Sequence, residues 1–231
     1  MIKRQLLELV LLFTAFFLPG FLWQTSLPDG ESVELGAYIL QFLVFAFPQT
    51  LLLVYILYLQ QPPPLSAFGI VRPRLRDLPA ALLYWAGLLA LVFILGLVFS
   101  ILPGSERFLS RGFRWELPAP ALIPAALLFS LVTGYREELF FRAYLLTRFT
   151  GLGAGPFPAV FLSSLLFAGG HLYQGPAGFS VALLQGCYFS LLFLRCRNLH
   201  RLAWAHGLYN ALILLVSLQN RLPFPISYIN F

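Results

Sequence analysis

Charged side chains are scarce in this chain of 231 residues, since Asp, Glu, Lys and Arg together make up only 10% of it. Hydrophobic residues account for 59%, and the mean hydropathy is +0.82. So few polar groups cannot cover the surface of a water-soluble globule of this length. The composition therefore excludes an ordinary soluble domain and predicts an integral, multi-pass membrane protein.

Cysteine is also rare, and the motifs of several familiar hydrolases are absent. Cys187 and Cys196 are nine residues apart and form neither a Cys-x-x-Cys pair nor the Cys/His spacing of a structural zinc site. The chain has no His-Glu-x-x-His motif, which excludes the usual membrane zincin. It has no Gly-x-Ser-x-Gly turn, which excludes the usual serine hydrolase.

Apolar runs of about 20 residues, the length that carries a helix across ~30 Å of hydrocarbon, recur along the whole sequence. They lack the period-two alternation of a membrane barrel, so we expect an all-α, polytopic membrane bundle of about seven transmembrane helices, with six or eight as alternatives. The expected segments are Leu6–Trp23, Leu35–Leu59, Leu78–Leu102, Pro118–Phe149, Phe157–Leu172, Ala177–Leu194 and Leu199–Leu218. The first follows Lys3-Arg4 as a signal peptide would, but no small-x-small cleavage site is evident after Trp23, so we expect a spanning helix.

Proline, glycine and arginine mark the expected loops, namely Pro62-Pro63-Pro64, Arg72/Arg74/Arg76 and Pro103-Gly104. Without a repeat or a long linker, we expect one membrane domain over 1–231, whose N-terminal helices occupy 1–102. The net charge of +6 comes from basic residues in loops and at helix ends, which indicates how the helices are oriented in the membrane and does not indicate nucleic-acid binding. With seven alternating helices most loop arginines share the side of Lys3-Arg4, which predicts a cytoplasmic N-terminus; Arg107, Arg111 and Arg114 fall opposite and break this pattern.

Polar clusters inside apolar segments are the strongest functional signal, because an ionisable group near the bilayer centre costs roughly 2.5–3.5 kcal/mol. The first cluster is Glu137-Glu138-Leu-Phe-Phe-Arg142. Glu138 and Arg142 are four apart and can pair on one helix face, whereas Glu137 points about 100° away. We expect Arg142 to neutralise Glu138 and Glu137 to face a cavity as a general base. The alternative is a purely structural Glu–Arg staple.

Two further clusters supply imidazoles and an amide. His171 ends the run Phe167-Ala-Gly-Gly-His171, in which the glycines allow helices to approach closely, and it can exchange a proton beside a carboxylate. His206 and Asn210 are four apart, share a helix face and suit an oxyanion hole. Each cluster alone also fits a core histidine or an interhelical hydrogen bond. Together they provide the minimum set for hydrolysing an amide with activated water.

The order Glu-Glu-x-x-x-Arg, Phe-x-x-x-His and His-x-x-x-Asn on successive membrane helices resembles the CPBP family. This is the CAAX protease and bacteriocin-processing group, also called Abi, which includes the Ras-converting CAAX prenyl endopeptidases. The resemblance covers residues 118–218, which we take as the catalytic core. Ala143 departs from the pattern, because a glycine often follows the arginine of the first motif.

The resemblance implies a role for each motif residue. Glu137 and His171 would activate the attacking water, and His206 and Asn210 would form the oxyanion pocket. Glu138 and Arg142 would hold the site together. It also implies a helical bundle whose polar cavity opens toward the cytosol and admits the C-terminal peptide of a substrate.

We therefore expect an intramembrane endopeptidase that cleaves a peptide bond near the C-terminus of a membrane-associated or lipidated, CAAX-type, protein or peptide. No cofactor is expected to be required; zinc is the alternative, with Glu137, His171 and His206 as its ligands. The expected partners are this substrate and the lipid bilayer, not nucleic acid. Two other functions remain alternatives: a non-catalytic scaffold or bacteriocin-immunity protein, and a small ion- or proton-coupled transporter.

Overall fold

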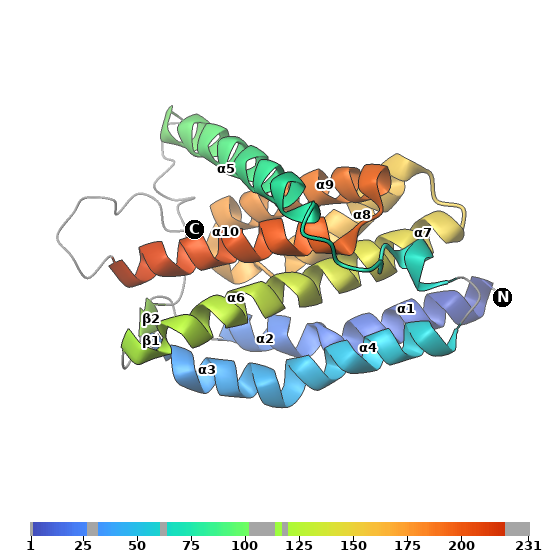
Figure 1. The fold of residues 1–231 in the computed structure, drawn as a ribbon, viewed down its shortest axis with the longest axis horizontal. Helices are drawn as coiled ribbons and strands as arrows, with labels where there is room; N and C mark the ends of the chain where they lie inside the picture. Colours follow the sequence, from blue (N-terminus) through green and yellow to red (C-terminus); the bar gives the residue numbers. More distant parts are fainter. Residues whose placement is uncertain (1, 27–31, 61–63, 102–113, 117–119, 220–231) are drawn as a thin grey trace.

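The computed structural model describes residues 2–26, 32–60, 64–101, 114–116 and 120–219. Nearly all of these residues are helical (Figure 1). The α-helices are α1 Ile2–Phe16, α2 Leu18–Ser26, α3 Leu35–Gln41, α4 Phe47–Leu59, α5 Asp77–Ile101, α6 Ile123–Glu138, α7 Thr147–Gly151, α8 Pro156–Gly169, α9 Gly175–Cys196 and α10 Leu199–Gln219. Two π-helical stretches, η1 Phe42–Ala46 and η5 Leu139–Leu146, and three 3-10 turns, η2 Leu65–Phe68, η4 Pro120–Leu122 and η6 Leu172–Gln174, lie between them.

Helices α3, η1 and α4 form one continuous rod over Leu35–Leu59, the bounds expected from the apolar pattern. Glu34 caps its start, because its carboxylate accepts hydrogen bonds from the backbone N–H groups of Gly36 and Ala37. The widened turn η1 ends at Ala46, two residues before Pro48, which has no N–H and whose ring crowds the preceding turn. A local π-helix accommodates this proline without breaking the rod.

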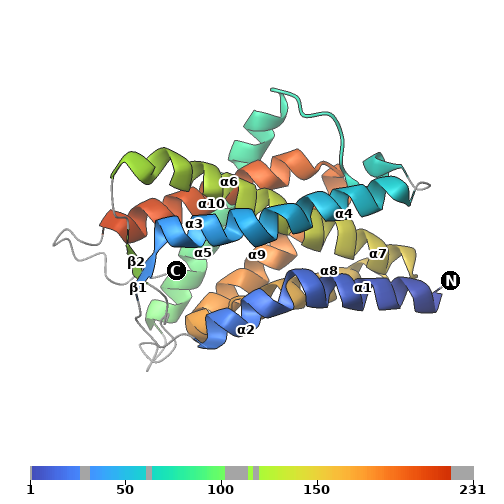
Figure 2. The same cartoon turned by 90° about the horizontal axis from the view of Figure 1, so that it is seen from below.

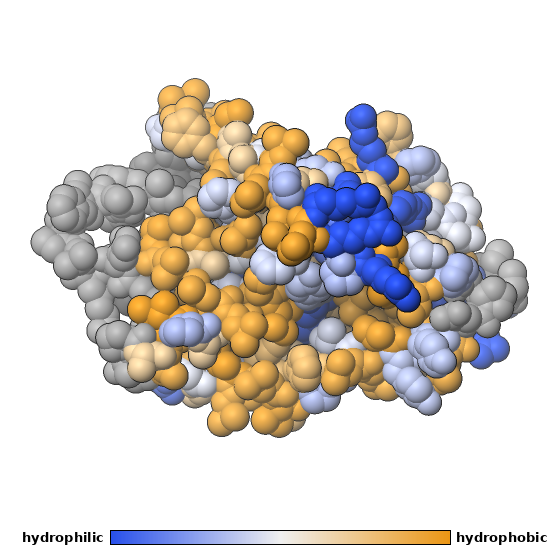
Figure 3. All heavy atoms as spheres, viewed as in Figure 1, coloured by the Kyte–Doolittle hydropathy of each residue, from blue (hydrophilic) through white to orange (hydrophobic). Residues whose placement is uncertain are grey.

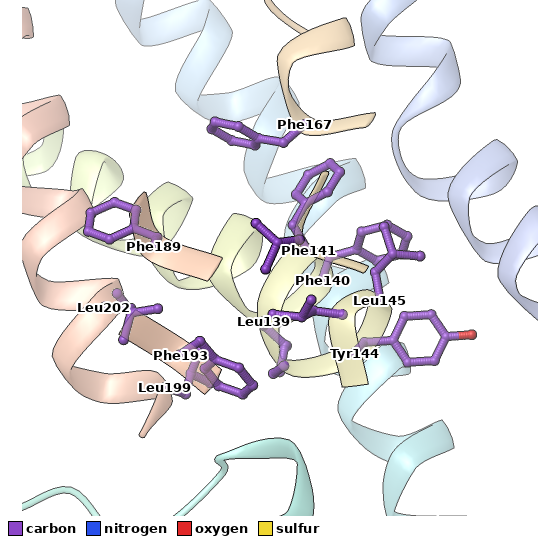
Figure 4. Packing of buried hydrophobic residues seen from close by; sticks show 14 of the residues in the cluster. Leu139, Phe140, Phe141, Tyr144, Leu145, Phe167, Phe189, Phe193, Leu199 and Leu202 are labelled. Atoms are coloured by element: carbon purple, nitrogen blue, oxygen red, sulfur yellow. The ribbon is translucent and has the colours of Figure 1, made fainter. Parts of the chain in front are cut away.

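Helix α6 lies alongside α10, and α8 packs against α9, so the last four long helices form the centre of the bundle (Figures 1 and 2). Helix α5 contacts α10 and α9 and then diverges from them toward its C-terminal end. The core between these elements is rich in phenylalanine, including Phe140, Phe141, Phe167, Phe189 and Phe193, all almost fully buried (Figure 4). The aromatic core therefore surrounds the segment that carries the first polar motif.

The outer surface of the bundle is apolar, as expected for a protein in lipid. Large side chains on α5 such as Leu83, Phe93 and Ile101 are more than half exposed. Leu35–Leu59, Asp77–Ile101 and Leu172–Cys196 are long and apolar enough to cross a membrane. The protein is an all-α integral membrane bundle. The remaining helices miss this criterion because they are short, as in α8, or contain the polar motifs.

Basic residues gather at one end of the bundle, which we call the basic end: the start of α1, the connection into α5, α7 and the α9–α10 turn (Figure 1). It carries Lys3, Arg4, Arg72, Arg74, Arg76, Arg148, Arg195, Arg197 and Arg201. Figure 3 shows hydrophilic side chains over the start of α5 and the α9–α10 turn within an otherwise apolar face. The structure thus places these residues together, as the loop-charge pattern predicts.

Several expected boundaries differ from the structure. The fourth segment begins its α-helix at Ile123 and continues through a π-helix to Gly151, and the fifth ends at Gly169, so that His171 lies in a turn and not in a helix. Two short strands, β1 (Ser32–Glu34) directly before α3 and β2 (Arg114–Glu116) before η4 and α6, pair in parallel. No strand was expected from the sequence. Pro62, Pro63, Pro103-Gly104, Arg107 and Arg111 lie outside the described residues.

Candidate active site

The Glu138–Arg142 pair lies at the junction of α6 and η5, fully inside the protein. Arg142 Nη1 is 3.0 Å from Glu138 Oε1, and both side chains have 0% exposure. The i,i+4 spacing that predicted this pair is therefore realised in the structure. Since a buried charge is costly without a partner, each side chain compensates the charge of the other.

The backbone changes from α-helix to π-helix directly after Glu138, and all eight residues of η5 are buried. Ser163 of α8 donates a 2.6 Å hydrogen bond to the carbonyl oxygen of Phe141 within this stretch. A π-helical turn is uncommon and occurs frequently at functional sites. It was not predicted, because no residue type specifies it.

His206 lies between the two carboxylates of the first motif. Its Nδ1–H donates to Glu138 Oε1 at 2.7 Å, while its Nε2 is 3.4 Å from Glu137 Oε2. His206 is 2% exposed, whereas Glu137 is 18% exposed. Glu137 is thus the accessible carboxylate, and Glu138 orients the ring of His206 from the interior.

Two glycines allow this contact between α6 and α10. A Cβ on Gly134 would lie 2.7 Å from the backbone nitrogen of Gly207, and a Cβ on Gly207 would lie 2.8 Å from Cα of Leu131. Gly134 is one turn before Glu137, and Gly207 follows His206 directly. The helices therefore touch backbone to backbone beside the site, as small residues permit in membrane proteins.

His171 enters the same region from the turn after α8. Its Nδ1 lies 3.1 Å from the carbonyl oxygen of Phe167 and must carry the proton, because a carbonyl only accepts. In the neutral ring Nε2 is then a proton acceptor. Glu137, His206 and Arg142 all interact electrostatically with His171. Three separate elements thus bring an acid and two imidazoles together.

Asn210 lies one turn beyond His206 on α10 and is half-buried. Within the part of the chain that the structure describes, its side chain makes no hydrogen bond. Its amide is therefore available as a donor next to His206 on the same helix face.

Aromatic rings form the wall behind these polar groups. The ring of Phe167 lies 4.8 Å from that of His171, 5.9 Å from that of His206 and 4.4 Å from the guanidinium carbon of Arg142. The ring of Phe189 lies 5.6 Å from that of His206. The sequence identifies Phe167 only as the first residue of the Phe-x-x-x-His motif. Its contacts with His171, His206 and Arg142 could not be inferred from spacing.

Arg136 is a neighbouring residue that sequence reasoning missed. Its Nη2 donates a 2.6 Å hydrogen bond to the carbonyl oxygen of Phe16, and its guanidinium stacks 4.1 Å above the ring of Phe17. Phe16 and Phe17 stand at the junction of α1 and α2. Arg136 therefore ties the residue next to Glu137 to the first helices of the chain.

Among the described residues, no group of three His, Cys, Asp or Glu side chains could hold a metal ion. His206 uses Nδ1 for Glu138, and His171 uses Nδ1 for a backbone carbonyl. These bonds fix the orientation of both rings and leave Nε2 of each as the nitrogen that can meet a water molecule or another partner.

Comparison with known families connects this geometry to a recognised group. Residues 119–212 match the family model described as type II CAAX prenyl endopeptidase Rce1-like. The match covers less than half of the chain, and over these residues the chain is similar to that family. The match spans the whole Glu137–His206 site, and at family level it identifies an intramembrane protease of the CAAX type. No curated protein and no solved structure matches the chain.

Proposed function

We propose that the Rce1-like domain hydrolyses a peptide bond near the C-terminus of a membrane-associated or lipidated protein or peptide. The observation that supports this most strongly is the ring of His206 set between Glu138 at 2.7 Å and the more accessible Glu137 at 3.4 Å. Such an arrangement has a cost in lipid, and a buried acid–imidazole cluster serves proton transfer well.

Glu137 is the proposed general base. Its carboxylate takes a proton from a water molecule, and the oxygen of that water attacks the carbonyl carbon of the scissile peptide. Nε2 of His171 accepts a hydrogen bond from the same water and orients it. Glu137, now protonated, passes the proton to the leaving nitrogen as the carbon–nitrogen bond breaks, which leaves a new carboxyl group and a free amine.

His206 and Asn210 are the proposed stabilisers of the tetrahedral intermediate. When both ring nitrogens of His206 carry protons, its charge and that of Arg142 balance the two glutamates. Nδ1–H then stays on Glu138, and Nε2–H donates to the developing oxyanion together with the amide of Asn210. These donors matter because little water is present to solvate the negative charge.

We also propose that the basic end faces the cytoplasm, which places the N-terminus there. The nine basic residues at that end agree with the excess of Lys and Arg found on cytoplasmic sides. A substrate anchored in the membrane would then present its C-terminal peptide from the cytoplasmic face.

The test is a cleavage assay with purified protein and a library of membrane-anchored peptides, using Glu137→Gln and a matched control, Glu34→Gln. Glu34 is an exposed helix cap far from the site, so its amide should leave cleavage unchanged. Glu137→Gln should lower the cleavage rate by roughly 10²-fold or more, with the Tm within a few degrees of wild type, because a general base does not hold the fold.

Two outcomes would contradict the proposal. No cleavage by wild-type protein combined with a large loss of Tm in Glu137→Gln would favour a scaffold. Proton or solute flux in liposomes without any cleaved product would favour a transporter.

A further inference from the structure

A cavity of about 600 Å³ lies at the basic end of the bundle, apart from the Glu137–His206 site. It is formed where the start of α1, η2, α7 and the end of α9 meet, and its volume is in the range of small-molecule sites. Its polar lining consists of two arginines, Arg148 and Arg197, and four neutral side chains, Gln5, Ser66, Thr147 and Thr150. The cavity therefore offers several hydrogen-bond donors to a single ligand.

Arg148 forms the fixed wall of this cavity. It lies 3.3 Å from Glu8 Oε1, which also accepts a 2.9 Å hydrogen bond from the hydroxyl of Tyr144, and it donates to Gln60 as well. Glu8 cancels the charge of Arg148. The buried Nε–H of Arg148 nevertheless has no acceptor among the described residues. A buried donor without a partner is unfavourable unless a ligand or water supplies one.

Arg197 supplies the uncompensated charge. Its Nη1 donates to Thr147 Oγ1 at 3.3 Å, and its guanidinium lies 5.5 Å from the ring of Phe193. No carboxylate of the described residues lies within ion-pair distance of it. With Arg148 neutralised, the lining keeps one net positive charge.

The backbone of Arg197 gives an independent indication of function. It caps the C-terminus of α9 with φ of 45°, and it is the one non-glycine residue with positive φ in the described parts of the chain. Helices usually place glycine at such a position, because a side chain is strained there. Strained residues cluster at ligand sites. The position thus keeps a guanidinium where glycine would fit with less strain.

We propose that this cavity binds the phosphate group of an anionic phospholipid headgroup, with Arg197 as the charged contact. A guanidinium fork matches two phosphate oxygens, and the hydroxyl of Ser66 and the side-chain amide of Gln5 supply further donors. Basic pockets at the cytoplasmic ends of membrane helices bind such headgroups. Free inorganic phosphate shares this chemistry, so the test separates the two sources.

The experiment measures the Tm of the purified, detergent-solubilised chain with added short-chain phosphatidylglycerol, phosphatidylcholine of the same chain length, or inorganic phosphate. Phosphatidylglycerol should raise the Tm of wild type and of the control Arg195→Gln, which removes an exposed arginine two residues away. Arg197→Gln should weaken the apparent affinity roughly tenfold or more.

A second variant separates ligand binding from a structural role. Arg197→Gly should also lose the response, yet its Tm without ligand should equal or exceed that of wild type, because glycine relieves the positive φ. A fall in that Tm would mean that Arg197 only holds the fold. Equal responses to both lipids, or an unchanged response in the Arg197 variants, would overturn the proposal. An equal effect of inorganic phosphate alone would assign the site to free phosphate and reject the lipid.

Discussion

Replacing Arg142 by methionine should destabilise the protein by about 3–5 kcal/mol, because Glu138 would remain as an uncompensated charge at 0% exposure. The 4.4 Å stacking of the guanidinium on Phe167 would be lost as well, which adds about 0.5–2 kcal/mol. Glu138 keeps its 2.7 Å hydrogen bond from His206, so the lower end of the combined range is expected. At about 2–4 °C per kcal/mol for a chain of this size, a loss of about 3.5 kcal/mol should lower the Tm by roughly 7–14 °C.

A double-mutant cycle isolates the charge from the lost packing. Adding Glu138→Gln to Arg142→Met removes both charges, so the double variant should be more stable than Arg142→Met alone. Thermal unfolding in one mild detergent gives the Tm of wild type, Arg142→Met, Glu138→Gln and the double variant. The control Arg195→Met changes an exposed arginine and should stay within about 0.5 kcal/mol of wild type. A Tm of Arg142→Met within about 2 °C of wild type, or a double variant less stable than the single one, would refute the buried-pair argument.

Two further predictions concern packing and cofactor. Gly186→Ala should destabilise the contact of α8 and α9 by about 1–3 kcal/mol, because its Cβ would lie 2.8 Å from Cβ of Ser164. Gly96→Ala on α5 meets no atom within 4 Å and should be neutral or gain up to about 1 kcal/mol; equal Tm changes would contradict this. Peptide cleavage should survive exhaustive chelation, and a loss of activity that added zinc restores would reverse the expectation of a metal-free site.

The helical bundle could be predicted because its cause is local. A run of apolar residues determines where a helix meets lipid, and the rod over Leu35–Leu59 has the predicted bounds. The Glu138–Arg142 pair was likewise accessible, since four residues along one helix set its geometry. Both features depend on neighbours in the chain.

The features that were missed depend on packing between distant segments. The hydrogen bond of His206 to Glu138 joins residues 68 positions apart, and nothing in either motif specifies their distance. The π-helical turn is supported by Ser163 on another helix, which spacing does not reveal. His171 lies in a turn because the helix ends at its glycines, where flexibility competes with continuation. The site residues themselves were chosen from chemistry, and their roles stay predictions until activity is measured.

Because α6 and α10 touch at Gly134 and Gly207, main-chain atoms set the distance between Glu137 and His206. The conformation of the loops does not determine this distance. A side chain at either position would push α6 and α10 apart, which would lengthen the distance between Glu137 and His206. Tolerance at these two positions should therefore follow the volume of the replacement, while its polarity should matter little.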